Sequence, residues 1–108
     1  MKHADFFKLV EMQSSHSGVR VKRFIKNGEF KGMTNFSMTE LRSGQKVEEH
    51  YHQSMNEFFY VLSGEGEMTV NGVLVQLEEG KVIAVSANEK HSLKALSDMK
   101  ILYFGLED

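Results

Sequence analysis

Apolar and polar residues alternate in short runs along most of the chain, and turn residues end each run. The clearest pair of runs, 67–70 and 73–77, is joined by Asn71 and Gly72. Asn-Gly is a preferred centre for a tight hairpin because both central residues of that turn need a positive φ. We therefore predict a β-hairpin at this point. The other predicted strands are residues 19–25, 33–41, 57–63, 82–85, 91–96 and 100–104.

These runs predict about eight strands and no helix in the body of the chain. Closely spaced strands favour a sandwich or a barrel, because closure of the sheet removes exposed edges. The length of 108 residues fits one hydrophobic core. We expect residues 1–18 to form an N-terminal arm and residues 19–108 to form one β-barrel domain. Within the arm, residues 3–12 are compatible with a helix, an extended segment or a strand.

Charge and cysteine content exclude several classes of function. The net charge is −2, and no basic block favours binding to nucleic acid or to an anionic membrane surface. The chain has no cysteine, which excludes disulfides, thiolate metal sites and thiol nucleophiles. This favours a reducing compartment. No apolar run is long enough to span a membrane and charges interrupt the N-terminal residues, so we expect a cytoplasmic protein.

Three histidines and one glutamate have the spacing of metal ligands. His50 and His52 are two residues apart, so on a strand both imidazoles point to the same face. The polar segment 53–56 lets the chain reverse and bring Glu57 back on the neighbouring strand. His91 begins a later strand and supplies a fourth ligand from across the barrel. The alternative is ordinary histidines at strand ends, satisfied by hydrogen bonds, and a solvated glutamate.

The first part of this ligand set lies in a longer motif. Gly44 is followed after five residues by His50-x-His52, after four more by Glu57, and after six more by Gly64. This spacing resembles the first motif of the cupin superfamily at every defining position. The resemblance implies an all-β jelly-roll barrel, also called a double-stranded β-helix, in a single domain. It also implies that the motif's two histidines and its glutamate bind a metal.

A second motif resembles the second cupin motif with three departures. Gly80 is followed after five residues by Ser86-x-Asn88, after two more by His91, and after three more by Ala95. Serine, asparagine and alanine stand where that motif has proline, glycine and asparagine. Asparagine tolerates the left-handed region that glycine serves, whereas serine frees the φ that proline would fix. The loop is therefore expected to be less rigid, and the ligand histidine is retained.

The ligand set limits the chemistry without selecting one reaction. Three imidazole nitrogens and one carboxylate suit a single divalent transition metal: Fe, Mn, Ni, Co or Zn. Four protein ligands on an octahedral ion leave two neighbouring positions for a small-molecule substrate that chelates the metal. With Fe²⁺ the resemblance implies a dioxygenase, for example of the quercetinase or acireductone dioxygenase kind. A non-redox isomerase, cyclase or lyase and a non-catalytic barrel that binds a small ligand remain open.

Strand alternation predicts the walls of the substrate pocket. Phe59 and Val61 share the face of the ligand glutamate, and Leu93 shares the face of the ligand histidine on the later strand. We therefore expect an apolar pocket that takes a small, fairly hydrophobic ligand. Lys90 and Lys94 alternate away from this face, and no other arginine or lysine is obviously placed to hold a phosphate. This disfavours a sugar-phosphate isomerase.

Three polar residues have weaker claims to a role. His3 and His16 lack partners at ligand spacing, so both are expected on the surface. Glu48 is expected on the same face as His50, where its carboxylate is able to accept an imidazole N–H. A solvated acidic turn is the alternative for that residue.

The apolar N-terminal residues 6–10 predict a covered surface. They are more apolar than a free tail, so they pack against the barrel of the same chain or cross to a partner. The aromatic outer face of the predicted strand 57–63 is a second reason to expect such a cover. We therefore expect a homodimer.

Overall fold

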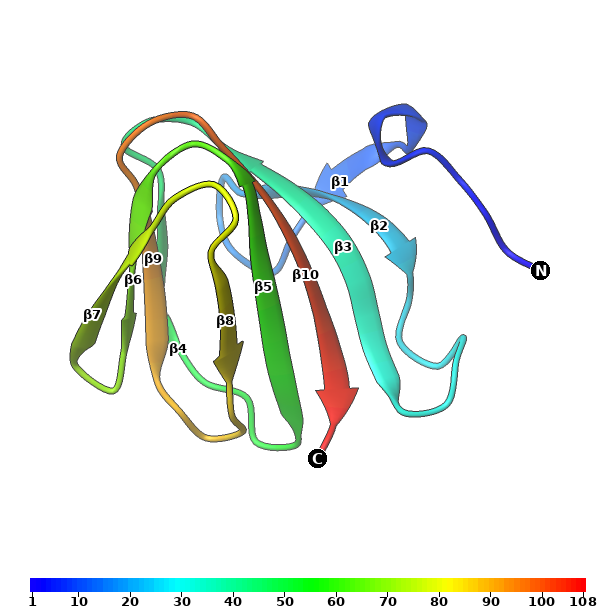
Figure 1. Cartoon of the computed structure of the whole chain (residues 1–108). Helices are drawn as coiled ribbons and strands as arrows, with labels where there is room; N and C mark the ends of the chain where they lie inside the picture. Colours follow the sequence, from blue (N-terminus) through cyan, green and yellow to red (C-terminus); the bar gives the residue numbers. More distant parts are fainter.

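The computed structural model describes all 108 residues as two facing β-sheets (Figure 1). The six-stranded sheet has the order β1–β2–β3–β10–β5–β8, the four-stranded sheet has the order β4–β9–β6–β7, and every pairing is antiparallel. This all-β, single-domain jelly roll is the predicted fold. The elements are the 3₁₀ turn η1 (Phe6–Lys8) and strands β1 (Glu11–Gln13), β2 (Arg20–Ile25), β3 (Met33–Leu41), β4 (Lys46–His50), β5 (Met55–Ser63), β6 (Gly66–Val70), β7 (Val73–Leu77), β8 (Val82–Val85), β9 (His91–Ala95) and β10 (Met99–Glu107).

Most predicted strands are present, and the predicted hairpin is confirmed. Asn71 and Gly72 have φ values of 48° and 81° and join β6 to β7. The structure adds two strands, β1 and β4, to those expected. Residues 3–12 do not form the helix that was one alternative, since η1 is a single 3₁₀ turn; the strand alternative is met only at their end, where β1 begins. No helix is long and apolar enough to cross a membrane.

Apolar side chains fill the end of the barrel where β3, β5 and β9 finish. Gly64 lies in this end with a φ of 87°, and a Cβ on it would clash with the peptide oxygen of Asp98. Only glycine therefore allows the two neighbouring connections to approach so closely. Each fully buried Val, Leu or Met side chain contributes roughly 1.5–3 kcal/mol to stability. The buried cluster consists of Val19, Leu41, Val61, Met68, Leu77, Val85, Leu93, Ala95, Met99 and Ile101.

Strand register arranges the inner face of the six-stranded sheet in rows. Arg23 on β2 pairs with Ser37 on β3, Ser37 pairs with Tyr103 on β10, and Tyr103 pairs with Phe59 on β5. Side chains that pair across strands share a face of the sheet, so this largely polar row lines the barrel interior. The next row, toward the apolar end, is Val21, Thr39, Ile101 and Val61.

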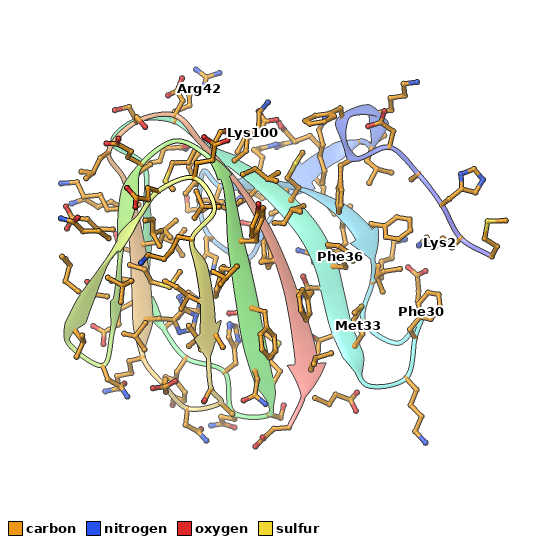
Figure 2. All side chains as sticks on the ribbon, viewed as in Figure 1. Lys2, Phe30, Met33, Phe36, Arg42 and Lys100 are labelled. Carbon is orange, nitrogen blue, oxygen red and sulfur yellow. The ribbon has the colours of Figure 1, made fainter.

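The N-terminal turn covers part of the outer face of the same sheet. The Phe6 ring lies 6.1 Å from the ring of Phe24 and 5.5 Å from that of Phe36, both in edge-on contact. Figure 2 shows Phe36 on the side of the sheet nearest the N-terminal segment. The apolar N-terminal residues therefore pack on the barrel of their own chain, which is one of the two arrangements expected.

Candidate metal centre

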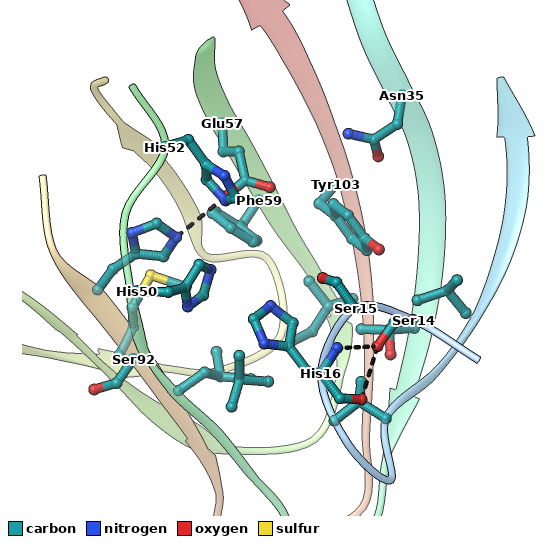
Figure 3. A pocket seen from close by; sticks show the side chains of 18 of the residues that line it. Ser14, Ser15, His16, Asn35, His50, His52, Glu57, Phe59, Ser92 and Tyr103 are labelled. Carbon is teal, nitrogen blue, oxygen red and sulfur yellow. Dashed lines mark hydrogen bonds and ion pairs between the residues drawn. The ribbon is translucent and has the colours of Figure 1, made fainter. Parts of the chain in front are cut away.

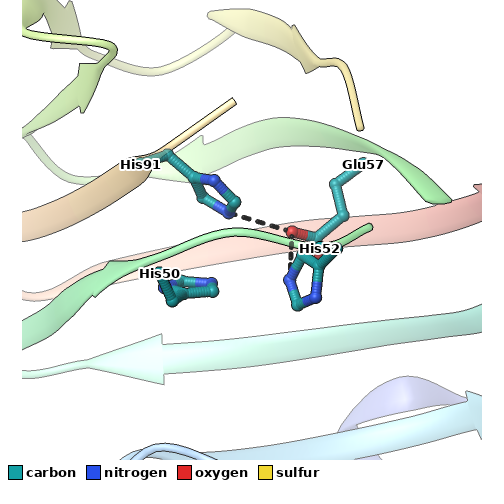
Figure 4. Close-up of side chains that lie close together, drawn as sticks. All are labelled: His50, His52, Glu57 and His91. Atoms are coloured by element: carbon teal, nitrogen blue, oxygen red, sulfur yellow. Dashed lines mark hydrogen bonds and ion pairs between the residues drawn. The ribbon is translucent and has the colours of Figure 1, made fainter. Parts of the chain in front are cut away.

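Four side chains from three neighbouring segments meet at the open end of the barrel (Figure 4). His50 ends β4, His52 lies in the loop that follows, Glu57 lies on β5, and His91 begins β9. Their ligand atoms all lie within 4.8 Å of one another. Glu57 Oε1 is 3.2 Å from His52 Nε2 and 3.1 Å from His91 Nε2. The structure thus brings together the four ligand residues that the sequence predicts.

A bulge in β4 aims His50 into the barrel. Both Val47 and His50 pair with β9, opposite Leu93 and His91 respectively, and the register shifts between them. An extra residue breaks the simple alternation of side chains. Glu48 therefore does not share the inner face with His50, and its side chain is exposed. Of the two alternatives for Glu48, the carboxylate contact is wrong and the solvated side chain is present, because the peptide oxygen of Glu48 accepts the hydrogen bond from His50 Nδ1 at 2.7 Å.

The loop of the second motif holds the loop of the first. Asn88 has a φ of 69°, in the left-handed region, as expected for the residue that replaces glycine. Its backbone N–H donates a hydrogen bond of 2.7 Å to the peptide oxygen of His52. The backbone N–H of Ser86 donates to the Glu89 carboxylate at 2.7 Å. These two bonds fix the loop beside the ligands in the absence of the usual proline.

The hydrogen bonds of two histidines direct their Nε2 atoms toward the centre of the cluster. Nδ1 of His50 bonds to the peptide oxygen of Glu48, and Nδ1 of His91 bonds to that of Glu89. A carbonyl oxygen only accepts, so each Nδ1 carries the proton and a neutral ring presents its Nε2 lone pair. In His91 that lone pair faces an oxygen of Glu57 at 3.1 Å. Two acceptors at this distance repel one another unless a proton or a metal ion lies with them.

The electrostatics of the cluster favour one added positive charge. Burial lowers the pKa of His50, and the peptide oxygen of Glu48 offsets this only in part. Burial also acts to lower the pKa of His91, but the carboxylate of Glu57 and the peptide oxygen of Glu89 outweigh it and raise that pKa. The surroundings of His91 therefore attract a cation, while the ring of His50 stays neutral and its nitrogen is available to bind a metal.

The spacing and chemistry of the donors fit a single transition-metal ion. Two donors that each lie about 2.1 Å from a metal, at right angles, are about 3 Å apart. The distances of 3.2 Å and 3.1 Å from Glu57 to the nitrogens of His52 and His91 match such neighbouring positions. Three nitrogens and one carboxylate oxygen suit the divalent first-row metals and do not select among Fe, Mn, Ni, Co and Zn.

A cavity of about 220 Å³ opens beside the four ligands. Phe59 and Leu93 line it, where the sequence places the substrate pocket. Val61 does not line the cavity, since it lies in the apolar core with 1% of its surface exposed. Alternation gives its inward direction, but its depth depends on the register of β5 with β10. Its expected place in the pocket is therefore wrong.

The family model described as a cupin domain matches residues 37–105, which include all four ligands. The chain belongs to the cupin family. Tetracenomycin polyketide synthase protein TcmJ of Streptomyces glaucescens is 33% identical over 55 residues, 51% of this chain and 37% of that protein. Quercetin 2,3-dioxygenase of Bacillus subtilis is 37% identical over 51 residues, 47% of this chain and 15% of that enzyme. This cupin thus spans well under half the length of either curated relative.

A solved structure of similar size shares the whole fold. The crystal structure of a predicted oxalate decarboxylase from Thermotoga maritima superposes with a TM-score of 0.87 and 22% sequence identity. The superposition covers 96% of this chain and 97% of that one. The likeness shows that the jelly roll extends across nearly all of this cupin.

The tip of the β1–β2 hairpin borders the cavity (Figure 3). Residues 14–16 line it, and the ring of His16 lies 4.3 Å from that of His50. His3 is exposed as expected, but the same expectation for His16 is wrong, because its side chain is half-buried. Burial lowers the pKa of His16 more than the charge of Glu57 raises it. Recognition of the three-residue strand β1 would have placed this turn in a hairpin over the site.

One wall of the cavity is polar, which the sequence analysis missed. Arg23 and Tyr103 line it together with Asn35. Arg23 Nε donates a hydrogen bond of 3.0 Å to Ser37 Oγ, and Nη2 donates one of 3.4 Å to the Tyr103 hydroxyl. Most of the cavity surface is apolar, as expected, but this wall is polar, and the expectation of no arginine or lysine placed to hold an anion is wrong. The signal was present, because Arg23 shares the inward face of its strand with Val21.

Proposed function

We propose that this cupin is a metal-dependent enzyme acting on a small organic molecule that chelates the metal, with dioxygenase chemistry as the leading candidate. The observation that carries the proposal is the cluster of His50, His52, Glu57 and His91 beside a cavity of about 220 Å³. The similarity to quercetin 2,3-dioxygenase over 51 residues supports this choice of reaction. That enzyme is much longer, so its substrate is not assigned to this chain.

The residues of the chain have separable roles in this proposal. A bound transition metal would supply Lewis-acid or redox chemistry to the chelated substrate. Glu57 and His91 are the buried ligands, which keep the centre shielded from water on the side of the barrel core. His50 and His52 lie nearer the surface. Phe59 and Leu93 give the substrate an apolar contact surface and restrict the water around it.

A non-redox isomerase, cyclase or lyase is the second candidate. The donor set accepts Zn²⁺ and Mn²⁺ as well as Fe²⁺, and the similarity to a polyketide synthase protein, TcmJ, fits chemistry on keto and enol groups. The third candidate is a barrel that binds a small ligand without turnover. Consumption of O₂ separates the first candidate from the other two, and conversion of the ligand separates the second from the third.

The decisive experiment combines metal analysis with O₂ uptake. Protein purified without an affinity tag is analysed for metals, stripped with a chelator, and reconstituted with Fe²⁺ under anaerobic conditions. O₂ uptake is then followed against a panel of enols, diketones and flavonols. The expected result is near-stoichiometric metal with substrate-dependent uptake. Stoichiometric metal without uptake would favour the second and third candidates, and no binding of any divalent metal would overturn the proposal.

A further inference from the structure

Arg23 is a cation in the cavity wall without an acidic partner. Its side chain is half-buried on the inner face of β2 and lines the same cavity as the metal ligands. No ion pair in the structure includes it. Its partners, Ser37 and Tyr103, are neutral hydroxyl groups. A charged group removed from water usually has a compensating charge, so this arginine calls for an anion in the cavity.

The guanidinium group is held in place by a chain of hydrogen bonds. Ser37 is completely buried; its hydroxyl accepts from Arg23 Nε and donates to the side-chain oxygen of Asn35 at 3.0 Å. Burial raises the pKa of Tyr103, although the adjacent Arg23 lowers it, so the phenol stays protonated near neutral pH. Donors fixed before a ligand arrives lose less entropy on binding, which is a property of binding sites.

The polar wall lies apart from the metal ligands within one cavity. Figure 3 shows Tyr103 and Asn35 on the β10 and β3 side, with His50 on the far side. Glu57 supplies one negative charge, and its Oε1 already contacts two histidines. When the imidazoles are neutral, a divalent ion and Arg23 together outweigh the charge of Glu57, and the cavity carries two excess positive charges. A neutral substrate would leave both uncompensated.

We propose that Arg23, together with the Tyr103 hydroxyl, binds the carboxylate of the substrate, which is therefore a small organic acid. The carboxylate accepts hydrogen bonds from the guanidinium N–H groups of Arg23, and other oxygens of the same molecule bind the metal. A planar guanidinium matches the two oxygens of a carboxylate. A single arginine with one phenol suits a monoanion better than a phosphate dianion. The proposal rests on the proposed function only for the end of the substrate that binds the metal.

The test uses a matched pair of probes on metal-free protein. Benzoate and benzamide have nearly the same shape, but only benzoate is charged. Their dissociation constants are measured at pH 7.5 by NMR titration of the chelator-treated protein. We expect benzoate to bind at least about tenfold more tightly than benzamide, since a charge-assisted contact is roughly twice as strong as a neutral one. Arg23→Gln should weaken benzoate binding about tenfold or more and leave benzamide binding unchanged.

Two further variants make the result specific to the guanidinium group. Arg20→Gln makes the same change on the same strand, at an exposed residue that pairs with Glu11, and should leave benzoate binding unchanged. Tyr103→Phe removes only the hydroxyl and should weaken benzoate binding by a few fold. If Arg23→Gln does not fold, Tyr103→Phe still tests the subsite through this smaller loss.

Metal titration of the same proteins separates this inference from the proposed function. Arg23→Gln should bind divalent metal as the unmodified protein does. Equal binding of benzoate and benzamide, or of benzoate to the protein and to both pocket variants, would overturn the carboxylate subsite and leave the metal centre intact. If the unmodified protein binds no metal, the proposed function is overturned. A measured preference for benzoate over benzamide would then still support the carboxylate subsite.

Discussion

The two faces of the six-stranded sheet carry opposite kinds of side chains. On the inner face near the cavity, Arg23 and Tyr103 form a hydrogen-bonded polar wall. On the outer face of the same strands, the Phe58 and Phe104 rings stack 4.9 Å apart, and Phe36 packs edge-on against Phe104 at 6.0 Å. In most sandwiches the inner face is apolar and the outer face is polar. Near the cavity, this sheet reverses that order.

The difference teaches which interactions maintain each face. Polar groups inside the barrel are stable only with specific partners, so removal of one partner leaves another group unsatisfied. The aromatic rings outside are stabilised by the area that they bury, which depends little on exact geometry. Changes to the inner face should therefore alter binding, whereas changes to the outer face should alter stability or association.

The largest effect is expected at the inner face, from His52→Ala. Loss of one of four metal ligands should lower metal affinity by at least about a hundredfold, because even an outer partner of a ligand is worth about ten- to a hundredfold. His52 lies in a loop and is partly exposed, so the barrel should stay folded. Metal content after dialysis measures the effect, and His3→Ala is the matched control. Full occupancy in His52→Ala would contradict the ligand assignment.

Removal of the metal should lower the thermal stability substantially. Glu57 belongs to the six-stranded sheet, and His50 and His91 belong to the four-stranded sheet, so a bound ion joins the two. A metal at a hundred times its Kd stabilises the native state by about 2.7 kcal/mol. For a domain of this size that corresponds to about 10 °C or more in Tm. Calorimetry with and without a chelator measures the shift, and a chelator effect of equal size in His52→Ala would argue against this mechanism.

On the outer face, Phe36→Ala should reduce stability and leave metal binding unchanged. The ring contacts those of Phe6, Phe24 and Phe104 and is half-buried. Truncation of a fully buried phenylalanine costs about 3–5 kcal/mol of unfolding free energy. Because Phe36 is only half-buried, we expect a loss of about 2 kcal/mol. Phe30→Ala, at an exposed phenylalanine, should change stability by less than about 0.5 kcal/mol. Denaturant unfolding gives both values, and a loss of metal in Phe36→Ala would break the separation of the two faces.

The smallest effect on the folded chain is expected from Val82→Lys. Val82 is 66% exposed and borders an apolar groove with Tyr60 and Phe104 on the outer face. The homodimer expected from the sequence stays a prediction, and we expect its interface to lie on this outer face. Sedimentation equilibrium should show a dimer that Val82→Lys converts to monomer. Val73→Lys, at a valine 65% exposed on the other sheet, should leave the dimer intact. A monomeric unmodified protein would rule out the dimer.

The sequence predicts the features that depend on local rules. The hairpin at Asn71 and Gly72 follows from turn chemistry. The ligand pair of His50 and His52 follows from the spacing of the motif, although His52 lies in the loop after β4 and not on a strand. The ring centroids of these two histidines lie 5.1 Å apart. Local turn geometry decides the hairpin, whereas the bulge against β9 and the hydrogen bond from Asn88 to His52 also help to set the positions of the two histidines.

The features that the sequence analysis missed depend on contacts between distant segments. Alternation shows that Val61 points inward, but only the register of β5 with β10 places it below the cavity. Glu48 turns outward because of a bulge that forms against β9. His16 reaches the site because the short strand β1 pairs with β2. The position of Arg23 in the cavity was predictable once β2 was known to form part of the cavity wall.

The position of β10 has a consequence for how the molecule is made. This last strand lies between β3 and β5, in the middle of the six-stranded sheet, and contributes Ile101 and Tyr103 to the cavity. During synthesis, β3 and β5 leave the ribosome with no partner between them. Until residues 99–107 emerge, the nascent chain exposes unpaired strand edges and lacks part of its pocket. The barrel therefore completes its fold only once β10 has emerged, and until then its unpaired strand edges are open to aggregation.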